Sequence, residues 1–210
     1  FYMGLEPYEG RYTLQLQQWN ESVFRRRGID YVVVPGQTID NTKAISVGQV
    51  LDAHGRSFFG MSQMMNLVKM MQQGKVTSDD VIYFEDMFQP GFESLPYIID
   101  QCDEDNMPRI FVRCLAQSID PDDFVHVWGM DDWMRSYEKM VCSSVDGVLA
   151  TNEEMVGTVN EHLMTAAILA NTGVTHGATN IASGAHLARS VGLISQDAAS
   201  GSGSASVRAS

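Results

Sequence analysis

The segment Val145–Met155, with the sequence VDGVLATNEEM, decides the fold of this chain. Residues 148–150 form a short apolar run that is typical of a buried strand. Thr151 is suited to be a helix N-cap, and Glu154, three residues later, completes a capping box. A strand that leads directly into a helix N-terminus creates a corner that favours anions. The segment therefore predicts an α/β domain whose ligand-binding loops lie at the carboxyl ends of its strands.

Runs of the same kind recur along residues 1–157, separated by segments with helical periodicity. We predict strands at residues 1–3, 29–34, 81–84, 109–116 and 147–150. Parallel strands need crossover connections, and the intervening helices supply them. The alternation of strands and helices therefore predicts a doubly wound, mostly parallel sheet with helices on both faces.

Three of the expected helices have apolar stripes that we expect to face the core. The first stripe belongs to a helix that Gly28 is suited to end, and it consists of Tyr12, Leu16, Trp19 and Val23. The second follows a predicted turn at residues 54–56 and consists of Met61, Met64, Met65, Val68 and Met71. The third consists of Met130, Trp133, Met134, Tyr137, Met140 and Val141. We interpret the methionine stripe as core.

Composition excludes some classes of function. The formal charge of −12 disfavours a nucleic-acid-binding surface or a basic membrane patch. No apolar run is long enough to span a membrane. Cys102, Cys114 and Cys142 lack the spacing of a metal site and indicate reduced thiols, so we expect a cytoplasmic protein without a bound metal.

The chain has two parts of different composition. After Gly157 it contains no aromatic residue, and its four charged side chains sum to zero. Gly, Ala, Ser and Thr dominate that part, and such a composition cannot bury enough apolar surface to form a core. We predict one domain at residues 1–157, a helix continuation with a low-complexity, non-domain segment at 158–200, and a flexible tail at 201–210.

Three loops at expected strand ends contain candidate site residues. In the first loop, Gly4 and Gly10 allow the backbone to approach a ligand, and Arg11 follows them. An ordinary strand–helix connection explains this loop equally well. Glu85 and Asp86 end the apolar strand at 81–84, where a carboxylate can accept a proton from a hydroxyl group. The alternative for these two is a solvated turn or a helix cap.

The third loop follows the expected strand at 109–116. Arg113 is a charge inside an apolar run, and Gln117 follows it. A charge there needs a partner, so Arg113 either contacts an anionic ligand or pairs with a carboxylate such as Glu85. Residues 120–123 (DPDD) superficially match an Asp-x-Asp metal motif, although a turn is the better interpretation. No dinucleotide or NTP fingerprint is present.

The order of these elements resembles the N-terminal half of GT-B glycosyltransferases. Three segments, LDAHGR (51–56), YFEDMF (83–88) and FVRCLAQSIDPDDF (111–124), resemble glycosyltransferases encoded by T4-like phages of cyanobacteria. The segment DGVLATNEE (146–154) matches the strand and helix near the end of the first GT-B domain. The resemblance covers residues 1–157 and implies a Rossmann-like fold and, for a phage protein, the host cytoplasm.

The resemblance implies that the complete enzyme moves a sugar from a nucleotide-sugar to a hydroxyl acceptor. Glu85 and Asp86 would be catalytic, and the loops with Gly4, Gly10, Arg11, Arg113 and Gln117 would bind substrate. The family needs no metal and no cofactor besides the donor substrate, and nucleic acid is conceivable only as the acceptor.

A second Rossmann-like domain binds the donor in that family, and residues 158–210 do not resemble it. We therefore expect the donor-binding domain to be missing and the function of the chain to be incomplete. Two rival functions remain: a non-catalytic α/β ligand-binding or interaction domain, and a nucleotide-sugar enzyme with a metal at residues 120–123.

Overall fold

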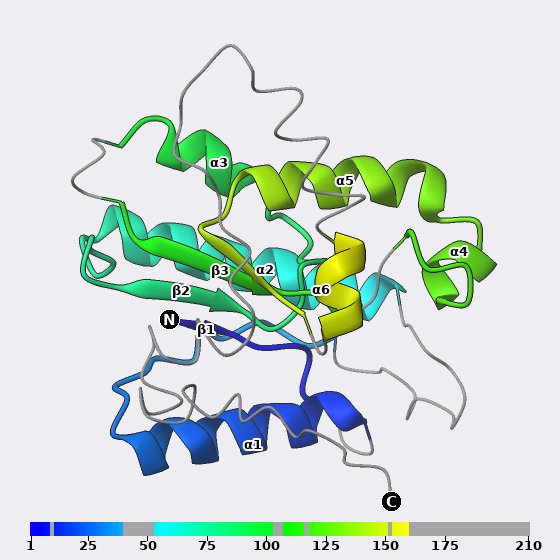
Figure 1. Ribbon diagram of the computed structural model, residues 1–210. Coiled ribbons are helices and arrows are strands. Elements are labelled where there is room, and N and C mark those ends of the chain that lie inside the picture. The colour runs from blue at the N-terminus through cyan, green and yellow to red at the C-terminus, as the bar shows by residue number, and fades with distance from the viewer. Residues whose placement is uncertain (9–10, 40–52, 103–106, 116–117, 151–152, 160–210) are drawn as a thin grey trace, which may run out of the picture.

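The structure is a computed structural model that describes residues 1–8, 11–39, 53–102, 107–115, 118–150 and 153–159 (Figure 1). This part of the chain forms a small α/β unit in which helices surround a parallel sheet. The strands are β1 (Tyr2–Met3), β2 (Val81–Phe84), β3 (Arg109–Arg113) and β4 (Gly147–Leu149). The helices are α1 (Tyr12–Arg27), α2 (Ala53–Gln72), α3 (Ser94–Ile99), α4 (Phe124–Val127), α5 (Asp131–Ser143) and α6 (Glu153–Val159).

The four strands are all parallel, in the order β1-β2-β3-β4. This confirms the predicted strands at the chain start, at 81–84 and at 147–150, whereas β3 is shorter than predicted and ends at Arg113. The predicted strand at 29–34 is absent as a strand. It contributes one parallel bridge, between Tyr2 and Val33, because β1 has only two residues and offers little length for pairing.

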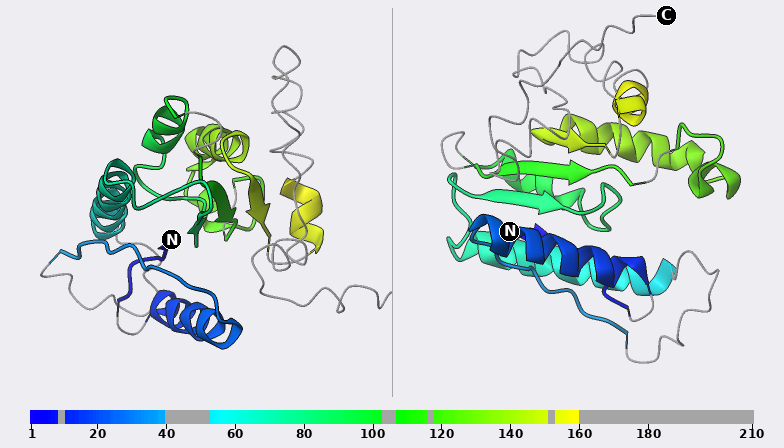
Figure 2. Two further views of the ribbon diagram at one scale, coloured as in Figure 1. Left: turned by 90° about the vertical axis from the view of Figure 1, so that its left-hand side faces the viewer. Right: turned by 60° about the horizontal axis from the view of Figure 1, so that its bottom comes forward.

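Helices lie on both faces of the sheet. The left view of Figure 2 shows α2, α3 and α5 on one side and α1 on the other. Alternate residues of each strand point to opposite faces. Ile82 and Phe84 therefore pack toward α2 and α3, while Tyr83 points toward α1, where its ring stacks on that of Tyr2.

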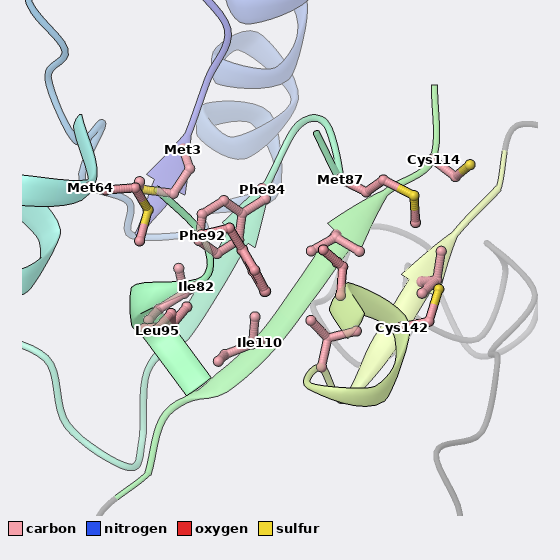
Figure 3. Packing of buried hydrophobic residues seen from close by; sticks show 14 of the residues in the cluster. Met3, Met64, Ile82, Phe84, Met87, Phe92, Leu95, Ile110, Cys114 and Cys142 are labelled. Atoms are coloured by element: carbon pink, nitrogen blue, oxygen red, sulfur yellow. The ribbon is translucent and has the colours of Figure 1, made fainter. Parts of the chain in front are cut away.

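The core lies between the sheet and α2, α3 and α5 (Figure 3). Phe84 and Phe92 contact edge to face, with ring centroids 5.2 Å apart. Cys114 and Cys142 are buried and Cys102 is exposed, and none of these three thiols forms a disulfide. Burial raises the pKa of the Cys142 thiol to about 12, so this thiol is protonated at neutral pH.

The structure corrects the predicted face of α1. Gly28 ends the helix as predicted, in the left-handed conformation with φ of 65°. Thr13 and Phe24 are the buried residues of the helix, whereas Tyr12 and Trp19 are exposed. The predicted stripe is therefore misplaced by about one residue around the helix.

The structure also corrects the start and the face of α2. The helix begins at Ala53, so the predicted turn at residues 54–56 is part of its first turns. Met64 and Leu67 are buried, but Met61 and Met65 of the predicted core stripe are exposed.

Several predictions fall on residues that the structure does not describe. Thr151 and its cap lie there, as do all but the first two residues of the segment predicted at 158–200, and the tail predicted at 201–210. Among the helices that are described, none is long and apolar enough to cross a membrane.

Candidate functional site

A small cavity of about 90 Å³ opens at the carboxyl edge of the sheet. It lies among the loops that follow β1, β2 and β3, the first turns of α1, α2 and α4, and the helix α5. The lining residues are Leu5, Glu6, Arg11, Tyr12, Thr13, Arg56, Asp86, Met87, Phe88, Leu115, Phe124, Met134 and Glu138. Apolar walls with a few convergent polar groups are typical of a ligand site, and ligands of parallel sheets bind at this edge.

A chain of ion pairs forms the polar side of this cavity. Arg56 donates from Nη1 to Glu6 Oε2 at 2.7 Å and from Nη2 to Asp86 Oδ2 at 3.0 Å. Its Nη2 also donates to the Phe88 carbonyl oxygen at 2.7 Å. Arg11 Nη1 lies 2.9 Å from the other oxygen of Glu6. Arg56 therefore joins the loops that follow β1 and β2 to the start of α2.

Burial and charge oppose each other at this ion-pair chain. Burial raises the pKa of Asp86, although Arg56 and the Phe88 N–H act against that shift. Burial lowers the pKa of Arg56, but Asp86 and Glu6 outweigh it and the net pKa of Arg56 is raised. Arg56 therefore stays charged, and Asp86 becomes a stronger base than an exposed aspartate.

The backbone accounts for part of this arrangement. Asp86 follows β2 directly, and its Oδ1 accepts the Phe88 N–H at 3.2 Å, which closes the turn. Arg56 stands in the first turns of α2, where the helix dipole disfavours a cation. Its position there is explained by the two carboxylates that it pairs with.

Glu138 of α5 also lines the cavity. Its carboxylate accepts hydrogen bonds from the N–H and the hydroxyl of Ser118. Burial raises the pKa of Glu138, and the two Ser118 contacts only partly counteract it. Ionisation of Glu138 therefore lowers the stability of the fold as the pH rises.

Glu138→Gln should become progressively more stable relative to wild type as the pH rises from about 4 to 8. A carboxyl group with a raised folded pKa adds stability below its unfolded pKa and loses it as the pH rises through the folded pKa. Glutamine keeps both Ser118 contacts and does not titrate. Urea unfolding of both proteins across this pH range measures the difference.

Glu21→Gln is the matched control with the opposite sign. The Gln17 hydrogen bond lowers the pKa of Glu21, so its carboxylate stabilises the fold above its unfolded pKa. Glu21→Gln should therefore lose stability relative to wild type as the pH rises. The same pH trend for both variants would contradict the interpretation of Glu138.

Glu85 and Arg113 form a separate network on the α1 face of the sheet. Glu85 Oε1 accepts from Arg113 Nη1 at 2.8 Å, and Oε2 accepts from Tyr2 and from Asn20 of α1. Glu85 is 1% exposed, and burial raises its pKa against the effect of Arg113. Neither Glu85 nor Arg113 lines the carboxyl-edge cavity. The two adjacent carboxylates thus belong to different networks, because Glu85 pairs with Arg113 and Asp86 pairs with Arg56.

The other predicted site residues divide into two groups. Arg11 lines the cavity, but Gly4 is buried, with its carbonyl oxygen accepting a hydrogen bond from Gln63 Nε2 at 3.2 Å. A Cβ on Gly4 would stand 3.4 Å from the Tyr2 ring, so this glycine is packed against protein. Gly10 and Gln117 lie outside the described residues.

A second, larger cavity of about 350 Å³ lies between α1 and the sheet. Phe24, Tyr83 and Phe111 give it apolar walls, and Asp30 and Asp80, which directly precedes β2, also line it. The carboxyl-edge cavity is smaller, but it has convergent charged groups at the edge where parallel sheets bind ligands. We therefore take the carboxyl-edge cavity as the candidate site.

The metal interpretation of residues 120–123 finds no support in the described residues. Asp123 caps α4 by accepting the Val125 N–H, and Asp120 accepts the Asp122 N–H in a turn. Within the described ranges, no three His, Cys, Asp or Glu side chains form a group that could hold a metal. Comparison of the chain with protein-family models, curated proteins and solved structures found no match.

Proposed function

We propose that residues 1–157 are the acceptor-side domain of a GT-B glycosyltransferase, which moves a sugar from a nucleotide-sugar to a hydroxyl acceptor. One observation carries the proposal: Asp86, whose pKa is raised by burial, lines a cavity with aromatic walls at the carboxyl edge of a parallel sheet. The acceptor hydroxyl would enter this cavity.

The pairing order of the strands supports a doubly wound topology for this domain. With the bridge at Val33 included, the order reads residues 29–34, β1, β2, β3, β4. The chain first adds residues 29–34 on one side of β1 and then adds β2 on its other side. The position between β1 and β2 is the switch point, where doubly wound folds bind their ligands. Glu6 follows β1 and Asp86 follows β2, so the cavity lies at that position.

Asp86 would be the general base. Its two described hydrogen bonds leave acceptor capacity on a carboxylate, which can accept about four. The acceptor hydroxyl gives its proton to Asp86, and its oxygen bonds to the anomeric carbon of the donor. The bond from that carbon to the diphosphate oxygen breaks, and the nucleoside diphosphate leaves with the electron pair. Arg56 would position Asp86.

A second candidate function is a non-catalytic ligand-binding domain. The observation that favours it is that two cationic side chains, Arg11 and Arg56, line the cavity. Such a domain would use the two arginines to hold a small anion, whereas the acceptor-side domain would use Asp86 to hold a neutral hydroxyl. Binding of inorganic phosphate separates the two candidates.

Asp86→Asn should weaken the binding of hydroxylated ligands at least tenfold, because an amide is a weaker acceptor than a carboxylate. We would screen the 210-residue chain by saturation-transfer NMR against methyl pyranosides, glycerol, nucleosides and serine peptides. In wild type, binding should also weaken as the pH falls through the raised pKa of Asp86. This pH series tests the same group without a substitution.

Asp30→Asn is the matched control, since Asp30 lines the larger cavity. Its binding should equal that of wild type, and near-UV circular dichroism should verify that both variants fold. Binding that is lost in Asp30→Asn and retained in Asp86→Asn would move the ligand to the larger cavity. Phosphate binding without binding of any neutral hydroxyl ligand would favour the non-catalytic candidate.

A further inference from the structure

Three aromatic side chains stand half-exposed around the carboxyl-edge cavity. Tyr12, Trp128 and Trp133 are 57%, 51% and 48% exposed, and we call them the aromatic rim. Tyr12 lines the cavity directly. Trp133 packs on the cavity residue Phe88, with ring centroids 5.8 Å apart, and Trp128 packs on the cavity residue Phe124 at 5.4 Å.

The rim gathers residues from separate parts of the chain. Tyr12 begins α1, Trp128 follows α4, and Trp133 stands in the first turn of α5. Figure 1 shows these helix ends on the side toward which the strands point. Large aromatic side chains are costly to leave in water, and groups of them on a surface mark places where a ligand or partner binds.

Charge restricts what this rim can bind. Asp120, Asp122 and Asp123 precede α4, and Asp131 and Asp132 begin α5. The chain as a whole has a net charge of −12. Such surroundings repel polyanions, so a nucleic acid or an anionic membrane is disfavoured. A neutral ligand avoids this repulsion.

A sugar ring combines the two features that the site offers to a ligand. Its C–H faces pack on aromatic rings, and its hydroxyl groups donate to carboxylates. The cavity of about 90 Å³ is too small for most ligands, whose pockets measure roughly 300–1,000 Å³. It therefore suits one projecting group of a larger molecule, whose body rests on the rim.

We propose that the acceptor is a neutral saccharide, one ring of which stacks on the aromatic rim while one hydroxyl group reaches Asp86. This inference rests on the proposed function, because it names the acceptor of the same site. Tyr12, Trp128 and Trp133 are then specificity-determining residues.

The three tryptophans of the chain provide the test. Trp19 is 64% exposed on α1, does not line the cavity, and is the matched control for Trp128 and Trp133. In the 210-residue Trp19→Phe variant, all tryptophan fluorescence comes from the rim. Titration with maltotriose, cellotriose or chitotriose should change this fluorescence. The same titration with a 12-base-pair DNA duplex should not.

Calorimetry should then compare the variants with the trisaccharide that changes the fluorescence. Its affinity should fall at least tenfold in the double variant Trp128→Ala, Trp133→Ala and remain unchanged in Trp19→Ala. Trp133→Phe, which keeps a ring on Phe88, should recover part of the loss. An affinity for the saccharide that is the same in the rim variants as in wild type would overturn the proposal. If the protein binds the DNA duplex and the rim variants do not, the rim is a nucleic-acid surface instead. If sedimentation shows dimers that the rim variants lose, the rim contacts a second copy of the chain.

The outcomes separate this inference from the proposed function. Rim-dependent saccharide binding that Asp86→Asn leaves intact would refute Asp86 as the acceptor-binding group while the saccharide site stands. Asp86-dependent binding of nucleosides or serine peptides, without any saccharide, would keep the proposed function and overturn the saccharide assignment.

Discussion

Arg56→Met should lower the free energy of unfolding by about 3–5 kcal/mol, because it removes one partner of a buried ion-pair cluster. Arg56 is 5% exposed and contacts both Glu6 and Asp86 at 3.0 Å or less. Methionine fills a similar volume but leaves Asp86 with no described ion-pair partner. A buried charge without compensation is far more costly than a lost surface contact. Urea unfolding at pH 7 measures the loss.

Arg25→Met is the matched control for this substitution. Arg25 forms a surface pair with Glu21 one helical turn away, and the Arg25 side chain is 62% exposed. Surface pairs of this kind are worth roughly 0–1 kcal/mol. Asp86→Asn in the Arg56→Met background should recover part of the loss, since it removes the unpaired charge. Equal stability of the two arginine variants would show that the buried cluster contributes no more than a surface pair.

The sequence predicted a parallel sheet and the positions of most of its strands, because short apolar runs between turn residues are a local signal. The positions of β2 and β4 follow from such runs. Gly147 illustrates what the runs do not reveal: a Cβ there would stand 2.8 Å from the ring of Phe111 on β3. A larger residue at position 147 would clash with a side chain 36 positions away in the sequence, and the periodicity of the sequence cannot show such a contact.

The buried faces of the helices were predicted less well. Tyr12, Trp19, Met61 and Met65 are apolar at helical spacing, yet all four are exposed. These helices have more apolar residues than their contact area with the sheet can cover. The rotation of each helix about its axis therefore decides which apolar side chains are buried. Polar Thr13 and Gln63 are buried instead because backbone carbonyl groups accept their hydrogen bonds.

The candidate site was partly visible in the sequence. Asp86 and Arg11, which line the carboxyl-edge cavity, were among the predicted residues because polar residues at strand ends and loop ends are a local pattern. Arg56 and Glu6 were missed because their pairing spans 50 positions. Glu138 could have been found, since it lies between Met134 and Val141 on the apolar stripe of α5, where an acid needs a partner.

Phe84→Ala should lower the free energy of unfolding by about 3–5 kcal/mol, the usual cost of truncating a buried phenylalanine. Phe84 ends the central strand β2, is fully buried, and packs on Phe92 in the core shown in Figure 3. Alanine would leave a void between the sheet and α2 and α3 that rigid neighbours fill only in part. Asp86 lies two residues further along the chain, so the loss would also loosen the cavity.

Tyr97→Ala is the control that separates burial from the mere loss of an aromatic ring. Tyr97 is 73% exposed on α3, and removal of an exposed side chain usually changes stability by less than about 0.5 kcal/mol. Urea unfolding should therefore give a far lower midpoint for Phe84→Ala than for Tyr97→Ala, with similar slopes. Hydrogen exchange should locate the loosened amides in β2, β3 and the loop that contains Asp86. A small effect of Phe84→Ala would mean that the sheet does not derive its stability from this face, and that another surface holds Asp86 in place.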